Sequence, residues 1–221
     1  MPRTADRGPM EALVFDMDGT VLHTLPDLVA AANEAFGVLG YPARTEAEAL
    51  TCMGCGGKHL VQKLMPQGCS REEQKRAFEL WRDIYIASEY SLTRPYPGIT
   101  DALCTLHERG VKTAILSNKF DAGVHLLSDR FFEGLFDMVR GEIEPAPRKP
   151  DPTVLLSMLD ELNVRPDKTA YVGDTIVDYE VARNAGVAAV GVSWGYDKAQ
   201  PLPISDLDYY IHDPAELLDL A

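Results

Sequence analysis

The chain has 221 residues, of which 46% are hydrophobic and 25% are charged, a composition typical of a globular protein in water. Its length allows one large domain or two small ones, with a core that needs no disulfide bonds. The formal net charge of -13 argues against nucleic acid or an anionic membrane as a partner, because both are bound through an excess of Lys and Arg.

The first predicted element is a short buried strand, residues 12–15, that runs into two carboxylates, Asp16 and Asp18, and then Gly19. Charges are costly to bury, so a strand that ends in this way usually ends at a functional site. In extended chain the two side chains point the same way, so one can attack while the other moves a proton, or both can face a cation. A polar Asp-Gly turn is the alternative interpretation. Residues 1–9 are expected to form a loose tail.

Helices are predicted over nearly all of the next stretch, up to residue 92. Thr24 and Ser70 each stand at a helix-start pattern, with an acidic residue in the following turn. The stretch is too long for one crossover between strands, so we expect a separate helical cap domain inserted into an α/β core domain. The alternative is that these helices pack on the sheet as one layer. The expected boundaries are 24–93 for the cap and 10–23 with 94–221 for the core, joined by hinges near 23–24 and 93–97.

A glycine-rich loop in this stretch carries the candidate substrate contacts Gly54, Gly56, Gly57 and Lys58. The glycines allow a close approach of backbone or ligand and leave N–H donors at the start of the following helix. Lys58 could meet a substrate carboxylate, and Arg94 at the second hinge is another candidate anion contact. A flexible turn between two helices is the alternative interpretation of the loop.

The cysteines do not indicate a metal site or a disulfide framework. Cys52 and Cys55 form a C-x-x-C pair, but the chain has no second pair to complete a structural zinc site. We therefore expect all four cysteines to be free thiols in a reducing cytoplasm. No apolar stretch reaches the length of a membrane span, and the first ten residues lack the apolar core of a signal peptide.

Apolar runs alternate with helical segments in the second half of the chain. Residues 111–116, 169–172 and 187–192 read as strands, and the shorter runs 136–139 and 209–211 are candidates for two more. This alternation predicts an α/β fold with parallel strands connected by crossover helices.

The later strands also end in polar residues. Ser117 and Asn118 can hold phosphate or carboxylate oxygens through hydrogen bonds, although Ser-Asn is also an ordinary loop sequence. Lys149 precedes a helix that we expect to begin at Asp151 and Pro152, where it could neutralise a phosphate beside the positive helix end. The alternative for Lys149 is a solvated surface lysine.

Two more carboxylates follow the strand at 169–172. Asp174 stands at the strand end and Asp178 one helical turn later, so both can face the same point, although Asp178 could also be a first-turn acid that the helix dipole favours. With Asp16 and Asp18 they would bring four carboxylates together, which repel each other strongly without a cation. Oxygen ligands favour Mg²⁺ over zinc or copper, so the pattern predicts a magnesium site.

These motifs, in this order, resemble those of the haloacid dehalogenase-like superfamily. The resemblance covers residues 11 to about 193, and the first motif is highly specific. Segments 117–119 and 148–152 look most like the phosphoglycolate phosphatase branch. The resemblance implies a Rossmann-like parallel sheet with helices on both faces, plus a cap of small helices. The matching motifs are Asp16-Met17-Asp18-Gly19-Thr20, Ser117-Asn118, Lys149 and Gly173-Asp174-x-x-x-Asp178.

The resemblance also implies a role for each matching residue. Asp16 would attack phosphorus to form an aspartyl-phosphate. Asp18 would protonate the leaving alcohol and then take a proton from water. Ser117, with Asn118 nearby, would bind the phosphoryl group, and Lys149 would balance the charge of the nucleophile and the phosphate.

The implied metal ligands are Asp16, the main-chain carbonyl of Asp18 and Asp174. Asp178 would be a further ligand or would orient the ligands or Lys149. The metal, Lys149 and backbone N–H groups would supply the positive field that the acidic chain as a whole lacks.

Two positions bear on the branch of the superfamily. Dehalogenases and phosphonate-cleaving members lack an acid at the position of Asp18, so its presence favours phosphate-ester chemistry. His23 departs from the pattern, since relatives often have an acid there, and we interpret it as a linker change without catalytic loss.

The sequence therefore predicts a Mg²⁺-dependent phosphatase for a small phosphorylated metabolite, with phosphoglycolate as the leading candidate. A sugar phosphomutase of the β-phosphoglucomutase type would use the same residues, and a catalytically silent binding domain is the third alternative. Silent copies usually lose the nucleophile or a metal acid, and here every motif residue is present. We expect a small-molecule phosphate ester as the partner, and a monomer or homodimer in the cytoplasm.

Overall fold

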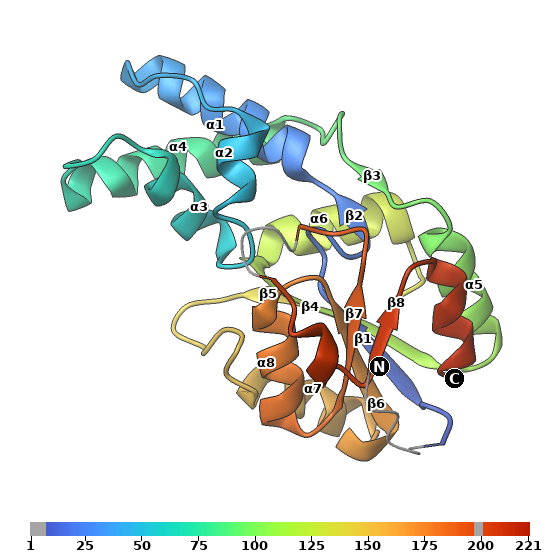
Figure 1. The fold of residues 1–221 in the computed structure, drawn as a ribbon. Coiled ribbons are helices and arrows are strands. Elements are labelled where there is room, and N and C mark those ends of the chain that lie inside the picture. The colour runs from blue at the N-terminus through green and yellow to red at the C-terminus, as the bar shows by residue number, and fades with distance from the viewer. Residues whose placement is uncertain (1–7, 197–200) are drawn as a thin grey trace.

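The computed structural model describes residues 8–196 and 201–221, and its centre is a six-stranded sheet (Figure 1). Residues 1–7 of the expected tail lie outside the described part. Every neighbouring pair of strands is parallel, in the order β5-β4-β1-β6-β7-β8, which confirms the predicted α/β class. After β1, the chain adds β4 and β5 on one side of β1 and then β6, β7 and β8 on the other. The strand order therefore reverses at β1. The strands are β1 (Ala12–Phe15), β4 (Lys112–Phe120), β5 (Met138–Glu142), β6 (Thr169–Gly173), β7 (Ala188–Val192) and β8 (Tyr209–Ile211).

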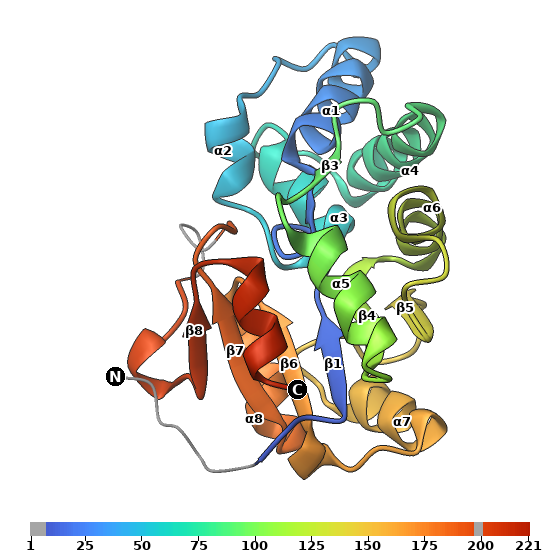
Figure 2. The same ribbon diagram turned by 90° about the vertical axis from the view of Figure 1, so that its right-hand side faces the viewer.

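Helices cover both faces of this sheet (Figure 2). Side chains alternate along each strand, so Leu13 and Phe15 belong to one buried cluster and Val14 to the other. Helices α5 (Ile99–Glu108) and α6 (Asp121–Phe132) pack on the first cluster, and α7 (Thr153–Leu162) and α8 (Ile176–Ala185) pack on the second. Three short helices, η1 (Pro166–Lys168), η2 (Ile204–Asp206) and η3 (Pro214–Asp219), complete this part. Among the described residues, no helix combines the length and apolar character needed to cross a membrane.

Two strands differ from the predicted ranges by more than one residue. The strand expected at 111–116 continues to Phe120, because β5 pairs with it again at Phe120 and Glu142 after a register shift. The same pairing places the strand expected at 136–139 two residues later.

The predicted helix starts are close to the observed ones. Ser70 accepts a hydrogen bond from the N–H of Glu73 and forms the expected capping box. The helix expected to begin at Pro152 begins one residue later, at Thr153. Thr24 also stands at a helix start, but its side chain makes no capping hydrogen bond.

Of the five helices between β1 and β4, all but α5 lie beyond the carboxyl ends of the strands and cover neither face of the sheet (Figures 1 and 2). We call residues 24–93 the helical insert. Its longest helix buries Ala77, Trp81 and Tyr85 and packs against two of the other helices. The four cysteines of the chain, most of them in this insert, are free thiols as predicted. The helices are α1 (Leu25–Leu39), α2 (Glu46–Leu50), α3 (Gly56–Leu64) and α4 (Arg71–Ala87).

The two connectors of the helical insert form a short antiparallel ribbon that the sequence did not indicate. Strand β2 (Leu22–His23) pairs with β3 (Arg94–Pro95). The buried Asp27 of α1 adds a second tie, because it accepts a 2.6 Å hydrogen bond from the N–H of Thr93. Both chain crossings between the insert and the sheet therefore lie side by side.

Candidate active site

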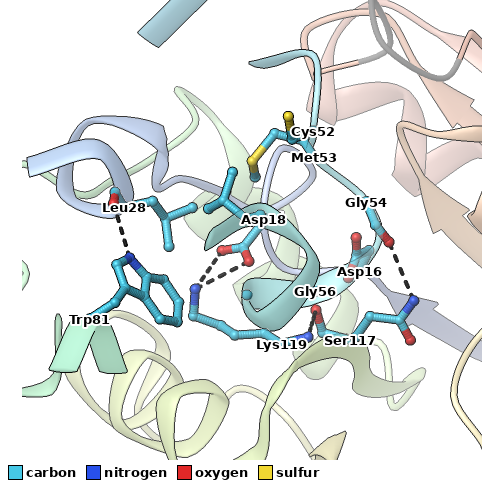
Figure 3. A pocket seen from close by; sticks show the side chains of 13 residues that line it. Asp16, Asp18, Leu28, Cys52, Met53, Gly54, Gly56, Trp81, Ser117 and Lys119 are labelled. Carbon is cyan, nitrogen blue, oxygen red and sulfur yellow. Dashed lines mark hydrogen bonds and ion pairs between the residues drawn. The ribbon is translucent and has the colours of Figure 1, made fainter. Parts of the chain in front are cut away.

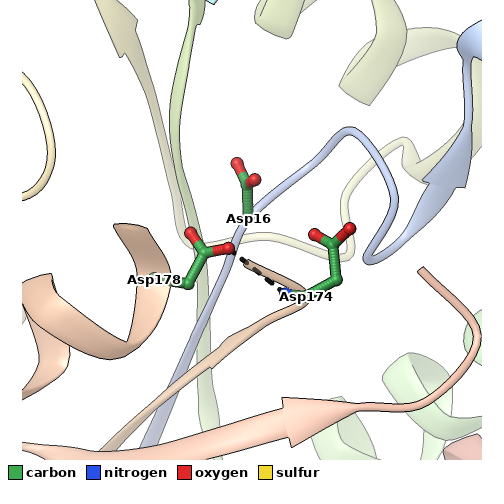
Figure 4. A group of neighbouring side chains, drawn as sticks. All are labelled: Asp16, Asp174 and Asp178. Carbon is green, nitrogen blue, oxygen red and sulfur yellow. Dashed lines mark hydrogen bonds between the residues drawn. The ribbon is translucent and has the colours of Figure 1, made fainter. Parts of the chain in front are cut away.

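The site lies where β1 and its neighbour β6 end, at the edge that faces the helical insert. Asp16 directly follows β1, Asp174 directly follows β6, and Asp178 stands in the first turn of α8. All three are buried, and one carboxylate oxygen from each lies within 4.8 Å of the others (Figure 4). The structure thus brings together three of the four acids that the sequence singled out.

Burial and mutual repulsion both act on these acids. Burial raises the pKa of Asp174 well above its usual value, and the negative charges of Asp178 and Asp16 raise it further. Burial also raises the pKa of Asp178, although Lys149 opposes this shift. Crowded carboxylates of this kind fit a hard divalent cation such as Mg²⁺, because it accepts oxygen ligands and removes the repulsion.

Two hydrogen bonds hold the carboxylate of Asp174 in place. Thr20 Oγ1 donates to one oxygen at 3.0 Å, and the backbone N–H of Tyr196 donates to the other at 2.6 Å. Gly19 and Gly195 pass so close to this carboxylate that a Cβ on either residue would overlap it. The position of Asp174 is therefore set by the surrounding backbone.

Lys149 is a buried cation beside the acids, not a surface lysine. Its Nζ donates hydrogen bonds to Asp178 Oδ1 and to Tyr171 Oη, both at 2.8 Å. It also lies 2.9 Å from Asp16 Oδ1, as an ion pair without hydrogen-bond geometry. Burial alone would lower the pKa of Lys149, but Asp16 and Asp178 raise it well above the usual lysine value. Lys149 is therefore held in its charged form.

Asp18 points away from this cluster and toward the helical insert. Its two carboxylate oxygens lie 3.0 and 3.1 Å from Lys119 Nζ, which is itself buried (Figure 3). The same ammonium stands 4.6 Å from the ring centroid of Tyr85, and Trp81 stacks on that ring. A cation thus lies between Asp18 and the aromatic side chains of α4.

A cavity of about 30 Å³ opens between these residues and the helical insert, which is room for only a few water molecules (Figure 3). Asp16, Asp18, Ser117 and Asn118 line it from the sheet. The insert contributes Leu28, Cys52, Met53, Gly54, Gly56, Gly57, Leu60 and Trp81 to the lining.

The glycine-rich loop contacts the end of β4 directly. Asn118 Nδ2 donates to the carbonyl of Gly54 at 3.3 Å and to the carbonyl of Lys149 at 3.1 Å. Gly56 has a φ of 81°, and a Cβ there would stand 2.6 Å from the backbone oxygen of Asn118. A Cβ on Gly57 would stand 2.5 Å from the Trp81 ring. These positions admit only glycine in the observed arrangement.

Two other candidate contacts, Lys58 and Arg94, do not line the cavity. Lys58 pairs with Glu144 at 3.0 Å on the exposed side of the loop. Arg94 donates to the carbonyl of Thr93 in the ribbon. His23 of β2, interpreted from the sequence as a linker residue, lies 2.8 Å from the hydroxyl of Tyr196.

Four residues of the site were not assigned roles from sequence: Thr20, Lys119, Tyr171 and Tyr196. Thr20 belongs to the first motif and Lys119 to the quoted segment 117–119, but these motifs did not indicate that the two residues contact Asp174 and Asp18. Tyr171 and Tyr196 carried no local signal, because their partners are distant in sequence.

Gly56→Ala tests the contact between loop and sheet. The added Cβ would clash with the carbonyl of Asn118 in a backbone region that costs an L-residue about 1–2 kcal/mol. We expect kcat/KM for p-nitrophenyl phosphate to fall about tenfold, mainly through KM. Gly37→Ala is the control, since a Cβ in α1 meets nothing within 4 Å and should raise stability by about 0.5–1 kcal/mol without changing kinetics. Equal kinetics for both variants would show that the loop does not close on β4.

The sequence and the fold of the chain are similar to those of known proteins. The chain is 30% identical over 223 residues to a phosphoglycolate phosphatase of Vibrio vulnificus, with 96% of each chain covered. It is 32% identical over 213 residues to one of Pseudomonas putida, covering 93% of this chain and 78% of that one. The crystal structure of a predicted phosphoglycolate phosphatase from Haemophilus somnus has a TM-score of 0.87 and 26% identity, covering 96% and 97% of the two chains.

The family model of haloacid dehalogenase-like hydrolases matches residues 13–192, a range that contains all four motifs and the helical insert. The resemblance to the phosphoglycolate phosphatase branch is confirmed by relatives that cover nearly the whole chain. The chain belongs to the haloacid dehalogenase-like hydrolases.

Proposed function

We propose that this hydrolase is a Mg²⁺-dependent phosphatase that cleaves a small phosphorylated metabolite through an aspartyl-phosphate, with phosphoglycolate as the leading substrate. The observation that carries the proposal is the position of Asp16. Its carboxylate stands at the end of the central strand, within the acid cluster and 2.9 Å from the Lys149 ammonium, and it lines the cavity. The names of the relatives support the choice of substrate.

Each residue of the site has its own role in the proposed reaction. A carboxylate oxygen of Asp16 forms a bond to phosphorus while the bond from phosphorus to the ester oxygen breaks. Asp18 gives its proton to the departing alkoxide and then removes a proton from the water that attacks the aspartyl-phosphate, which releases phosphate and restores Asp16. Ser117 and Asn118 would hold the phosphoryl oxygens, and the Lys149 ammonium would offset their charge.

The metal would be held by Asp16, Asp174 and the main-chain carbonyl of Asp18. Asp178, already bonded to Lys149 and to the N–H of Thr175, would orient this set. Bound Mg²⁺ supplies positive charge at the phosphoryl group and cancels the repulsion among the acids.

We further propose that the helical insert acts as a cap and that residues 10–23 and 94–221 form the core domain. The β2–β3 ribbon would be the hinge, because it contains both connectors. Closure would exclude water from the cavity and complete the binding site with Gly54, Gly56 and Gly57. A contact of Lys58 with a substrate carboxylate would require its ion pair with Glu144 to break. We place the enzyme in the cytoplasm, with a small phosphate ester as its partner.

The proposal is tested by a panel of phosphorylated metabolites that includes phosphoglycolate, hexose phosphates and p-nitrophenyl phosphate. We expect Mg²⁺-dependent release of inorganic phosphate, with the highest kcat/KM for phosphoglycolate. Isomerisation of a hexose phosphate without phosphate release would instead identify a phosphomutase. No turnover of any ester would contradict enzymatic function at this site.

Mg²⁺ should stabilise the protein, and more strongly at high pH. The pKa of Asp174 is higher in the folded than in the unfolded chain. Without metal, the contribution of Asp174 to the free energy of unfolding is therefore fully present below the unfolded pKa of about 3.9, and it is lost as pH rises through the folded pKa. Mg²⁺ binds the ionised carboxylates, so its stabilisation grows with pH over the same range. At a Mg²⁺ concentration of about 100 Kd, Tm should rise by roughly 5–10 °C at pH 8 and by less at pH 5. Thermal unfolding measures this, and Asp174→Asn should abolish most of the shift.

A further inference from the structure

Tyr196 is the residue through which the hinge of the helical insert contacts the acid cluster. It lies in the segment after β7, is 4% exposed, and bonds in two directions. Its hydroxyl faces the start of the insert, and its backbone N–H faces Asp174. The reaction proposed above uses neither contact.

The hydroxyl of Tyr196 caps the first helix of the insert. Its oxygen accepts hydrogen bonds from the backbone N–H of Thr24 at 2.9 Å and of Leu25 at 3.1 Å, and it lies 2.8 Å from His23 Nδ1. Thr24 stands at the N-cap position of α1, but its own Oγ1 is buried and makes no hydrogen bond with any described residue. The hydroxyl of Tyr196 therefore satisfies N–H groups at the start of α1, as the side chain of an N-cap residue does in most helices.

The backbone of the same residue fixes one oxygen of Asp174. The 2.6 Å hydrogen bond from Tyr196 N leaves little freedom, because Gly195 already lies against the Asp174 carboxylate. Trp194 Nε1 donates at 3.0 Å to the carbonyl of Thr20, whose hydroxyl binds the other oxygen of Asp174. In so tightly packed a region, Asp174 cannot shift without moving residues 194–196.

Aromatic contacts connect this segment to both connectors. The His23 ring in β2 lies 5.8 Å from the Tyr196 ring and 6.0 Å from the ring of Tyr96, which follows β3. Tyr96 in turn lies 6.3 Å from Trp194. The two strands of the hinge thus pack against the segment that holds Asp174.

We propose that Tyr196 is a positioning residue that couples the hinge of the helical insert to Asp174. When Asp174 is held by a bound Mg²⁺, the Tyr196 hydroxyl is held against the first turn of α1, and the seated insert strengthens Mg²⁺ binding by the same factor. This coupling rests on the proposed function, because it requires Asp174 to be a magnesium ligand.

Hydrogen–deuterium exchange of the full chain, with MgCl₂ alone as the probe, tests the coupling without any substitution. We expect Mg²⁺ to slow exchange in the peptide that contains the amides of Thr24 and Leu25 about fivefold, near the lower end of measured couplings between sites. A peptide at the other end of α1, near Tyr41, should show a smaller change. If calorimetry shows Mg²⁺ binding but the first-turn amides do not respond, the coupling is refuted and the proposed function is untouched.

Tyr196→Phe removes the hydroxyl and keeps the ring. We expect the Mg²⁺ Kd to rise about fivefold by calorimetry, the response of the first-turn amides to disappear, and kcat to recover at saturating Mg²⁺. Tyr41→Phe, which removes a hydroxyl from the far end of α1, is the matched control and should change none of these quantities. An unchanged Mg²⁺ Kd in Tyr196→Phe would overturn the proposal. Failure of the wild-type chain to bind Mg²⁺ would overturn both this inference and the proposed function.

Discussion

Asp16→Asn is expected to reduce phosphate release by at least about 10³-fold, because an amide in place of the carboxylate cannot form the bond to phosphorus. The loss should appear in kcat, with p-nitrophenyl phosphate and with the best substrate of the panel alike. The folded structure should survive the change. Asn has the same shape, and the loss of one charge weakens the repulsion that raises the pKa of Asp174.

Thermal unfolding separates this loss of chemistry from a loss of fold. Without Mg²⁺, the Tm of Asp16→Asn should not fall below that of the wild type. Asp167→Asn makes the same substitution on a side chain that is 61% exposed, and it should leave kcat within about twofold of the wild type. Phosphate release by Asp16→Asn at the wild-type rate would remove Asp16 as the nucleophile.

Lys149→Met should have the largest effect on stability. The substitution leaves the carboxylates of Asp16 and Asp178 buried without the ammonium that now lies between them. Breaking a buried pair in this way costs about 3–5 kcal/mol, and we expect a decrease of that size in the free energy of unfolding, measured with urea without metal. Under the proposed function, activity should fall as well, because Lys149 would no longer offset the charge of the phosphoryl group.

The pH dependence of this effect follows from the raised pKa of Lys149. Its contribution is fully present below the unfolded lysine pKa of about 10.4 and is lost only as pH rises through the higher folded value. The difference between wild type and Lys149→Met should therefore not decrease from about pH 6 to 9, and it should grow with pH if loss of the ammonium raises the pKa of Asp178 further. Adding Asp178→Asn should restore part of the stability but not the activity. Lys75→Met, on a lysine whose side chain is 68% exposed, is the control and should change stability by no more than about 0.5 kcal/mol. An unfolding free energy equal to that of the wild type would mean that the Lys149 ion pairs contribute nothing.

The sequence predicted the sheet and its polar end well because these depend on local patterns. Apolar runs located β1, β6 and β8 to within one residue, and the acids at 16, 174 and 178 could be expected to meet since parallel strands end at one edge. The β2–β3 ribbon was missed because strands of two residues are too short to show any alternation.

The missing contacts of the site are long-range ones. The hydroxyl of Tyr196 caps a helix 172 residues earlier in the chain, and Lys119 binds an acid 101 residues away. Neither contact leaves a spacing that a reader of the sequence could detect, because the Tyr196 contact depends on how the insert packs on the sheet and the Lys119 contact on how β1 and β4 pair. Lys58 was a reasonable candidate by its charge and its loop, but a neighbouring acid, Glu144, engages it on the outer surface.

The β2–β3 ribbon has a consequence for how this architecture can change. Since the chain leaves and re-enters the sheet through two hydrogen-bonded neighbouring strands, the stretch between them is a cassette with adjacent ends. A longer cassette would extend a segment whose two ends the ribbon already holds together. The entropic cost of closing such a loop grows only slowly with its length. Grafting cassettes from relatives onto this frame should therefore alter substrate choice while the acids and Lys149 remain in place.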